Sequence, residues 1–242
     1  MAENGGRTES IHDEGWWKNA NHDSTQRLAD QFDFNEWQWF LQSESAPPVP
    51  PPAAVVEGLA SPEHFTWLRS KEGLEQELFS EGVVRIGSVS DQWLNLAQHF
   101  CKTNPFDNVL SLGSERREDG YAEKGRVFAG PWEEWMKSLK HEYSYASVIT
   151  AFPTSDHHQG WHRDTPDDEE NSYHQITLMV YLTDVTQANG ATQFRRIASQ
   201  DEMLIEGSRG TVVAFESSRT EHRGLANRQD KPRVLLYIAF DD

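Results

Sequence analysis

The chain has little of several features that mark common protein classes. Its 242 residues include a single cysteine, Cys101, which excludes an internal disulfide and a cysteine-rich zinc site. Lys and Arg number 22 against 39 Asp and Glu, giving a formal net charge of −17. A nucleic-acid partner is therefore not expected, because phosphate backbones are bound by basic surfaces. The apolar runs are shorter than the roughly 18 residues of a membrane helix, so no membrane partner is expected either.

Other missing patterns narrow the choice further. The sequence has no internal repeat and no Gly-rich phosphate loop. The start, MAENGGRTES, lacks a basic segment followed by an apolar run, so we expect a cytoplasmic protein. With 36% hydrophobic residues and nine Trp, the chain is too apolar to be disordered and can form one core. The sequence does not indicate the oligomeric state.

Residues 1–60 differ in composition from the remainder. They are acidic and rich in aromatic residues, and their stretch APPVPPPAA favours a polyproline II spacer. We interpret residues 1–60 as an N-terminal extension and residues 61–242 as one folded domain. The aromatic residues of the extension have two explanations: they pack on the outside of the domain, or they form a lid or partner-binding strip over an active-site mouth.

The folded domain changes from helical to strand-like patterns near residue 140. Helices are predicted from Pro62 and over 74–79, 92–100 and 131–139, and a first strand over 83–86. Five runs rich in β-branched or aromatic residues, separated by turn residues, then predict strands over 143–152, 173–185, 191–196, 210–215 and 233–240. This order predicts a mainly β protein with flanking helices (α+β), built as an antiparallel sandwich or jelly roll.

The most informative stretch is Trp161-His162-Arg163-Asp164, between two predicted strands. Side chains alternate along an extended chain, so His162 and Asp164 project to one side and can reach one metal, while Arg163 points away. His222, after the predicted strand 210–215, can supply a second imidazole. Two imidazoles and one carboxylate leave three coordination positions open, the ligand set of non-haem Fe(II) oxygen chemistry. Alone, the H-x-D pattern also fits an ordinary histidine and a loop carboxylate.

Arg233 strengthens this interpretation. It lies eleven residues after His222 and begins an apolar predicted strand, RVLLYIAF. Burying an arginine is costly unless an anion pairs with it, and a carboxylate held by two parallel hydrogen bonds is a suitable partner. The C5 carboxylate of 2-oxoglutarate is such a ligand, with the keto acid end left to chelate the iron.

These motifs resemble those of the Fe(II)- and 2-oxoglutarate-dependent dioxygenases, and among them the phytanoyl-CoA hydroxylase-like group that includes ectoine hydroxylase. The resemblance covers residues 82–242 and includes, in order, EGVVRI, GWHRDT, YLTDVTQANGAT, GTVVAF and EHRGLANRQDKPR. It implies a double-stranded β-helix (jelly roll), with Fe(II) bound by His162, Asp164 and His222 and 2-oxoglutarate bound by Arg233. It also implies O2 as the second co-substrate.

The sequence departs from the family at one position. Members often carry a hydroxyl residue two positions after the distal histidine, where this chain has Gly224. We therefore expect Tyr181 or Thr177 to supply the second hydrogen bond to the co-substrate. Within 173–183 the odd positions, which include both residues, would line the pocket, and the even positions would pack on helices.

Candidate substrate residues are fewer and less specific. Tyr121, Arg126 and Phe128 lie before the predicted barrel, where such enzymes commonly build substrate pockets, although ordinary loop residues are the competing explanation. The acidic run at 167–170 is usually a solvated face, but it also fits a cationic substrate.

The sequence thus predicts an oxidoreductase that hydroxylates a small molecule, or otherwise oxidises it at a C–H bond, in specialised metabolism. An amino acid or an amine is the substrate class considered. The alternatives are a 2-oxoglutarate hydroxylase that modifies a peptide or protein, and a jelly-roll metal protein without 2-oxoglutarate. A non-enzymatic partner module built on the aromatic N-terminal segment would leave the metal-ligand pattern unexplained.

Overall fold

The computed structural model describes residues 52–103, 108–112, 115–119, 124–153, 158–164 and 174–242. Most of the predicted extension, Tyr121 and the acidic run at 167–170 lie outside these residues. Within them, no helix combines the length and the apolar character that crossing a membrane requires.

The elements follow the predicted order, with helices before most of the strands. The helices are α3 (Pro52–Ala60), the 3-10 helix η2 (Pro62–His64), α4 (Lys71–Glu81), α5 (Asp91–Thr103), the 3-10 helix η3 (Lys124–Ala129) and α6 (Glu133–Ser138). The strands are β1 (Phe65–Trp67), β2 (Val83–Val89), β3 (Asn108–Leu112), β4 (Glu115–Asp119), β5 (Glu142–Ala151), β6 (Gln175–Tyr181), β7 (Thr192–Arg195), β8 (Glu202–Leu204), β9 (Thr211–Glu216), β10 (His222–Gly224) and β11 (Arg233–Asp241).

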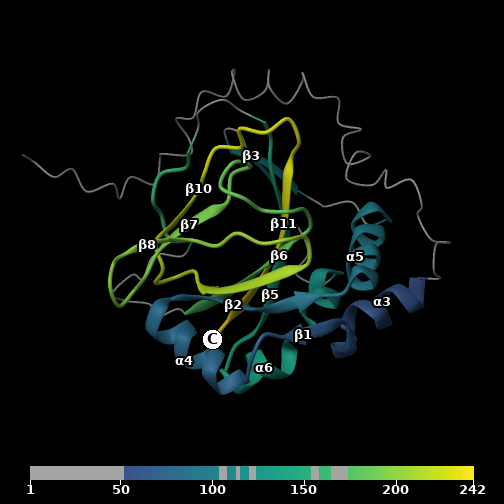
Figure 1. Cartoon of the computed structure of the whole chain (residues 1–242). Helices are drawn as coiled ribbons and strands as arrows, with labels where there is room; N and C mark the ends of the chain where they lie inside the picture. The colour runs from purple at the N-terminus through teal and green to yellow at the C-terminus, as the bar shows by residue number, and fades with distance from the viewer. Residues whose placement is uncertain (1–51, 104–107, 113–114, 120–123, 154–157, 165–173) are drawn as a thin grey trace, which may run out of the picture.

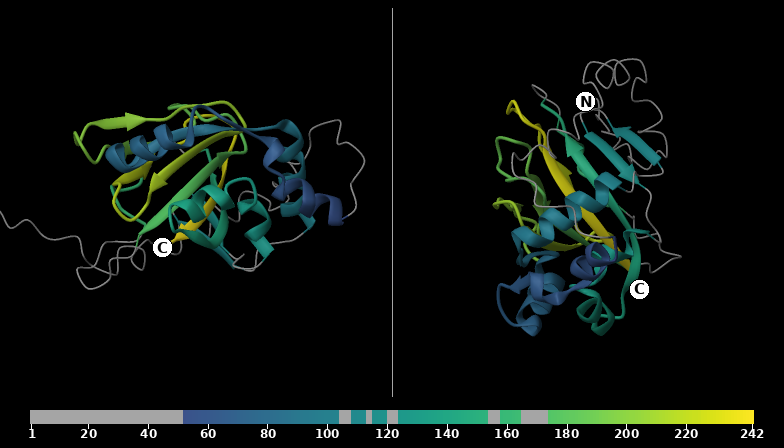
Figure 2. Two further views of the ribbon diagram at one scale, coloured as in Figure 1. Left: turned by 90° about the horizontal axis from the view of Figure 1, so that it is seen from below. Right: turned by 90° about the vertical axis from the view of Figure 1, so that its right-hand side faces the viewer.

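The strands form two antiparallel sheets. The larger sheet has the order β1-β2-β9-β6-β11-β5-β4-β3, and the smaller has the order β10-β7-β8 (Figure 1). The right-hand view of Figure 2 shows the yellow strand β11 running along the molecule beside β5, with which it pairs from Arg233 to Asp241. Strands that are consecutive in the sequence often lie in different sheets, or in non-adjacent places of the same sheet, as in a jelly roll. The predicted mainly β fold with flanking helices, a double-stranded β-helix, is confirmed.

Alternation along the central strands separates two cores. In β6 the even positions Ile176, Leu178 and Val180 belong to the core that also contains the helices, whereas Met179 and Tyr181 belong to a second core. The second core includes Phe194 of β7, so it lies between the two sheets. The predicted separation of the even positions, which face the helices, from the odd positions on the other side of the strand is therefore confirmed.

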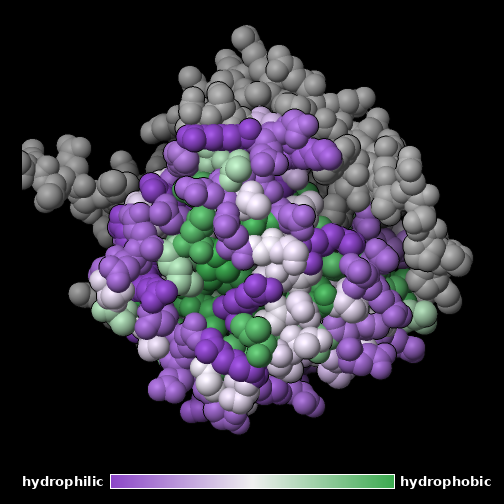
Figure 3. All heavy atoms as spheres, in the orientation of Figure 1, coloured by the Kyte–Doolittle hydropathy of each residue, from purple (hydrophilic) through white to green (hydrophobic). Residues whose placement is uncertain are grey.

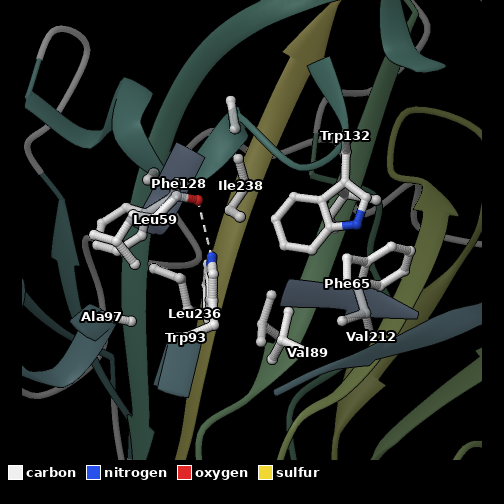
Figure 4. Packing of buried hydrophobic residues seen from close by; sticks show 14 of the residues in the cluster. Leu59, Phe65, Val89, Trp93, Ala97, Phe128, Trp132, Val212, Leu236 and Ile238 are labelled. Atoms are coloured by element: carbon white, nitrogen blue, oxygen red, sulfur yellow. Dashed lines mark hydrogen bonds between the residues drawn. The ribbon is translucent and has the colours of Figure 1, made fainter. Parts of the chain in front are cut away.

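Tryptophans dominate the helix-side core. Trp93 of α5 is fully buried, and its indole Nε1 donates a hydrogen bond of 3.0 Å to the Leu59 carbonyl (Figure 4). Trp132 makes edge-on ring contacts with Trp93 and Phe65, at centroid distances of 5.8 and 5.3 Å. These rings fix one face of the large sheet, leaving the opposite face for the site.

Helix α3 corrects one local prediction. The sequence predicts a polyproline II spacer that includes Pro52, Ala53 and Ala54. In the structure these residues begin α3, whose Val55 and Leu59 are buried in the helix-side core. Proline is tolerated in the first turn of a helix because its missing N–H has no helical partner there, so its presence did not exclude a helix.

The end of α4 anchors a segment that leads to the site. Gly82 follows the helix with φ 81°, a left-handed conformation that favours glycine, and its N–H donates to the Leu78 carbonyl. The Gly82 carbonyl accepts hydrogen bonds from Thr220 Oγ1 and the Glu216 N–H, both at 2.9 Å. The turn before His222 is thereby tied to the large sheet.

Candidate metal and co-substrate site

Backbone pairing brings the two histidines together. His162 and His222 form an isolated antiparallel bridge, with N–H to carbonyl distances of 3.0 and 2.9 Å in the two directions. Two residues later, the Asp164 N–H donates to the Ser217 carbonyl at 3.1 Å. The extended 162–164 segment is thus held at both ends, and the side chains of His162 and Asp164 project to the same side, as predicted.

The three predicted ligands meet at one point. One potential ligand atom from each of His162, Asp164 and His222 lies within 4.8 Å of the other two. Oδ1 of Asp164 is 3.7 Å from Nε2 of His162 and 3.5 Å from Nε2 of His222. The donor set of two imidazole nitrogens and one carboxylate oxygen fits Fe(II) and leaves coordination positions for other ligands.

Hydrogen bonds select the histidine nitrogens that face this point. Nδ1 of His162 is 2.9 Å from the Gly160 carbonyl, and Nδ1 of His222 is 3.2 Å from the Thr220 carbonyl. A carbonyl oxygen can only accept, so each Nδ1 carries the hydrogen and each Nε2 keeps its lone pair. The site is therefore oriented for metal binding by contacts that do not involve the metal.

Burial differs across the three residues. The side chain of His222 is 3% exposed and its ring lies 4.9 Å from that of Phe215, whereas the side chains of Asp164 and His162 are 17% and 26% exposed. The cluster is thus buried on the β10 side and open on the side of the 162–164 segment.

Figure 3 shows hydrophobic residues near the centre of the face seen in Figure 1, surrounded by hydrophilic ones.

Trp161 fixes the segment to the smaller sheet. The guanidinium carbons of Arg195 and Arg223 lie 4.0 and 4.6 Å from the Trp161 ring centroid, within cation–π range. Arg195 Nη1 pairs with Glu221 at 2.8 Å, and Arg223 Nε donates to Gln193 Oε1 at 2.9 Å. Trp161 therefore packs beside the ligand segment, in a position that supports His162.

Arg233 is a buried arginine at the start of β11. It is 1% exposed, it begins β11, and it alternates with Leu235 and Tyr237, which belong to the core between the sheets. Its positive charge acts on Tyr181 of the same core: burial raises the pKa of the Tyr181 hydroxyl, and Arg233 opposes that rise. Tyr181 therefore stays neutral beside Arg233.

The structure does not support Tyr181 and Thr177 as the second donor to the co-substrate. The Tyr181 hydroxyl donates to the Ile205 carbonyl at 2.8 Å, and Thr177 Oγ1 donates to Ser217 Oγ at 3.0 Å. A hydroxyl has one hydrogen and a carboxylate only accepts, so neither residue can donate to 2-oxoglutarate while these bonds persist. Both residues do lie on the predicted side of β6.

Replacing Tyr181 with Phe tests this point. We expect the variant to lose about 1 to 2 kcal/mol of stability, because the buried Ile205 carbonyl loses its donor. Its affinity for 2-oxoglutarate should change by less than about threefold, which is below 1 kcal/mol. Chemical denaturation and calorimetric titration of 2-oxoglutarate measure the two quantities. A loss of co-substrate affinity larger than the loss of stability would restore Tyr181 as a donor.

The predicted substrate residues are not brought to the cluster. Phe128 is fully buried in the helix-side core, with its ring 5.1 Å from that of Phe100, on the other side of the large sheet. Arg126 pairs at 2.8 Å with Glu133 and its side chain is 57% exposed. Phe128 is thus a packing residue and Arg126 a surface ion-pair partner, while Tyr121 lies outside the described residues.

Two positioning residues were missed by the sequence analysis. Gln159 Oε1 accepts from the Gly224 N–H at 2.7 Å, and Ser217 Oγ donates to Gln175 Oε1 at 2.9 Å. Both contacts join segments far apart in the sequence, so only the location of Gln159 beside the H-x-D motif could have signalled its role.

Comparisons with known proteins agree with the site. Residues 147–240 match the family described as the 2OG-Fe(II) oxygenase superfamily. No curated protein sequence matches the chain. Similar solved structures include the α-ketoglutarate-dependent epimerase SnoN from nogalamycin biosynthesis, at 15% identity and TM-score 0.58, covering 71% of this chain and 80% of that one.

Two further structures have similar values. EvdO2 from Micromonospora carbonacea var. aurantiaca, complexed with 2-oxoglutarate, has 14% identity and TM-score 0.55, with coverage of 74% of this chain and 93% of that one. The α-ketoglutarate-dependent carbocyclase SnoK from nogalamycin biosynthesis has 14% identity and TM-score 0.55, covering 73% of this chain and 86% of that one. At these identities the likeness to the solved structures shows the fold. The match over residues 147–240, which contain all three clustered ligand residues, points to Fe(II)- and 2-oxoglutarate-dependent oxygenase chemistry in this part of the chain.

Proposed function

We propose that this enzyme oxidises a C–H bond of a small molecule, with His162, Asp164 and His222 as iron ligands and Arg233 as the residue that binds the distal carboxylate of 2-oxoglutarate. The observation that carries the proposal is the convergence of two imidazole Nε2 atoms and one carboxylate oxygen within 4.8 Å. When bound, the iron with 2-oxoglutarate and O2 supplies the oxidising chemistry that the side chains lack.

The protein residues bind and orient. His222, held from Thr220 and packed on Phe215, provides a fixed direction for one ligand bond. Arg233 offers a planar set of N–H donors that matches a carboxylate. Apolar side chains of the core between the sheets, such as Met179 and Leu235, would exclude water from the space around the ion pair between Arg233 and the bound carboxylate.

The finer assignment is also a proposal. The ordered motifs of residues 82–242 support membership of the phytanoyl-CoA hydroxylase-like group. Since SnoN and SnoK are an epimerase and a carbocyclase of antibiotic biosynthesis, a small-molecule substrate from specialised metabolism, such as an amino acid or amine, is favoured over a peptide. A metal protein without 2-oxoglutarate is disfavoured, because the buried Arg233 would have no evident use there.

Anaerobic titration tests the proposal. Protein loaded with Fe(II) should develop the weak visible charge-transfer band of a chelated keto acid when 2-oxoglutarate is added, and no band with succinate, which lacks the keto group. Turnover with a metabolite library, scored by succinate release and product mass, then identifies the substrate. The absence of both the band and calorimetric binding of 2-oxoglutarate would favour the metal-protein alternative.

A further inference from the structure

A pocket lies on the outer side of the metal-ligand segment. Its volume is about 270 Å³, and it is lined by Arg163, Arg195, Ile197, Gln200, Arg219 and Glu221. Three of these side chains are cationic and one is anionic, in a chain whose formal net charge is −17. A concentration of arginines in one hollow of an acidic protein calls for a physical explanation.

The arginines differ in how far carboxylates neutralise them. Arg195 pairs with Glu221 at 2.8 Å, and Arg219 pairs with Glu216 at 2.8 Å. Burial is the main effect on Glu216 and raises the pKa of its carboxyl, while Arg219 opposes that rise. Arg163 is exposed and, among the residues that the structure describes, has no hydrogen-bond or ion-pair partner. Arg163 therefore brings an uncompensated positive charge to the pocket.

The pocket is separate from the iron site. Arg163 lies between His162 and Asp164, and side chains of an extended segment alternate in direction, so Arg163 points away from the ligands. Glu221 likewise precedes His222 and lines the pocket, whereas His222 faces the core between the sheets. The same two backbone segments thus carry metal ligands on one side and the pocket on the other.

We propose that this pocket binds a small oxyanion, a phosphate or carboxylate group of a metabolite, through the guanidinium groups of Arg163 and Arg219. Guanidinium N–H donors match the oxygens of both anions. The pocket is larger than one phosphate ion, so the rest of the metabolite can be accommodated beside Gln200 and Ile197. The site is independent of the proposed iron ligation.

Titration of metal-free full-length protein with inorganic phosphate and, separately, acetate tests the proposal. At low ionic strength, calorimetry should detect binding of at least one anion, and Arg163→Gln should weaken it about tenfold. Stronger binding of phosphate than of acetate would indicate a phosphate-bearing metabolite, and the reverse a carboxylate. Because Arg163 is exposed, the variant should fold normally, which circular dichroism checks.

Two variants separate this pocket from other arginines. Arg126→Gln removes an arginine outside the pocket and should leave anion binding unchanged. Arg233→Met removes the buried arginine of the proposed co-substrate site, so an anion bound at that arginine is lost, while the binding that Arg163→Gln weakens should remain. Anion binding that is lost in Arg233→Met and kept in Arg163→Gln would overturn the proposal, as would the absence of binding by either anion.

Discussion

Replacing Asp164 with Ala should lower turnover by about a thousandfold or more, while the fold remains. The carboxylate is one of three converging ligand groups, and a bound metal contributes several kcal/mol to such a reaction, each 1.4 kcal/mol being about tenfold in rate. The segment itself is held by the Asp164 N–H and the Ser217 carbonyl, a backbone contact that the variant retains. The carboxylate side chain is partly exposed, so its removal should leave little cavity.

Succinate release measures turnover, and thermal unfolding measures whether the variant is intact. Asp201→Ala is a matched control, because Asp201 is an exposed acid outside the ligand cluster. The control should keep wild-type turnover and metal affinity. Wild-type turnover in Asp164→Ala would show that Asp164 is only a loop residue and that the ligand set is wrong.

Periodicity explains which features were predictable. The period of two placed His162 and Asp164 on one side of an extended segment, and it divided β6 into its helix-facing and inter-sheet sides. Both predictions need only the local geometry of a strand. The same geometry, applied to Arg163, places it on the opposite side, where the arginine pocket lies.

Contacts between distant segments explain what was not predictable. The Tyr181 hydroxyl donates its hydrogen bond to the Ile205 carbonyl, and the Thr177 hydroxyl donates to Ser217 Oγ. Neither acceptor is near its donor in the sequence. Side-chain type suggested donors, but whether a donor is already satisfied depends on tertiary structure. The prediction that Phe128 lines a substrate pocket is wrong for the same reason. An aromatic residue in a Gly-flanked stretch fits a pocket and a core equally well, and the contact with Phe100 shows that Phe128 belongs to the core.

Arg233→Met should weaken 2-oxoglutarate binding by about 30- to 1000-fold, which corresponds to about 2 to 4 kcal/mol for a shielded charge-assisted pair. Methionine retains much of the length and apolar character of the side chain at this buried position, while removing the N–H donors. Metal affinity should be nearly unchanged, because His162, Asp164 and His222 form the cluster without Arg233.

The split between the two affinities gives Arg233→Met its diagnostic value. Calorimetry with 2-oxoglutarate and a competition titration with Co(II) measure co-substrate and metal binding separately. Arg233→Lys keeps the charge but not the planar donor set, so its co-substrate affinity should lie between that of the wild type and that of Arg233→Met. A general loss of packing would instead lower thermal stability and both affinities together. Unchanged 2-oxoglutarate affinity with lost metal binding would contradict the proposed role and would assign Arg233 to a structural ion pair.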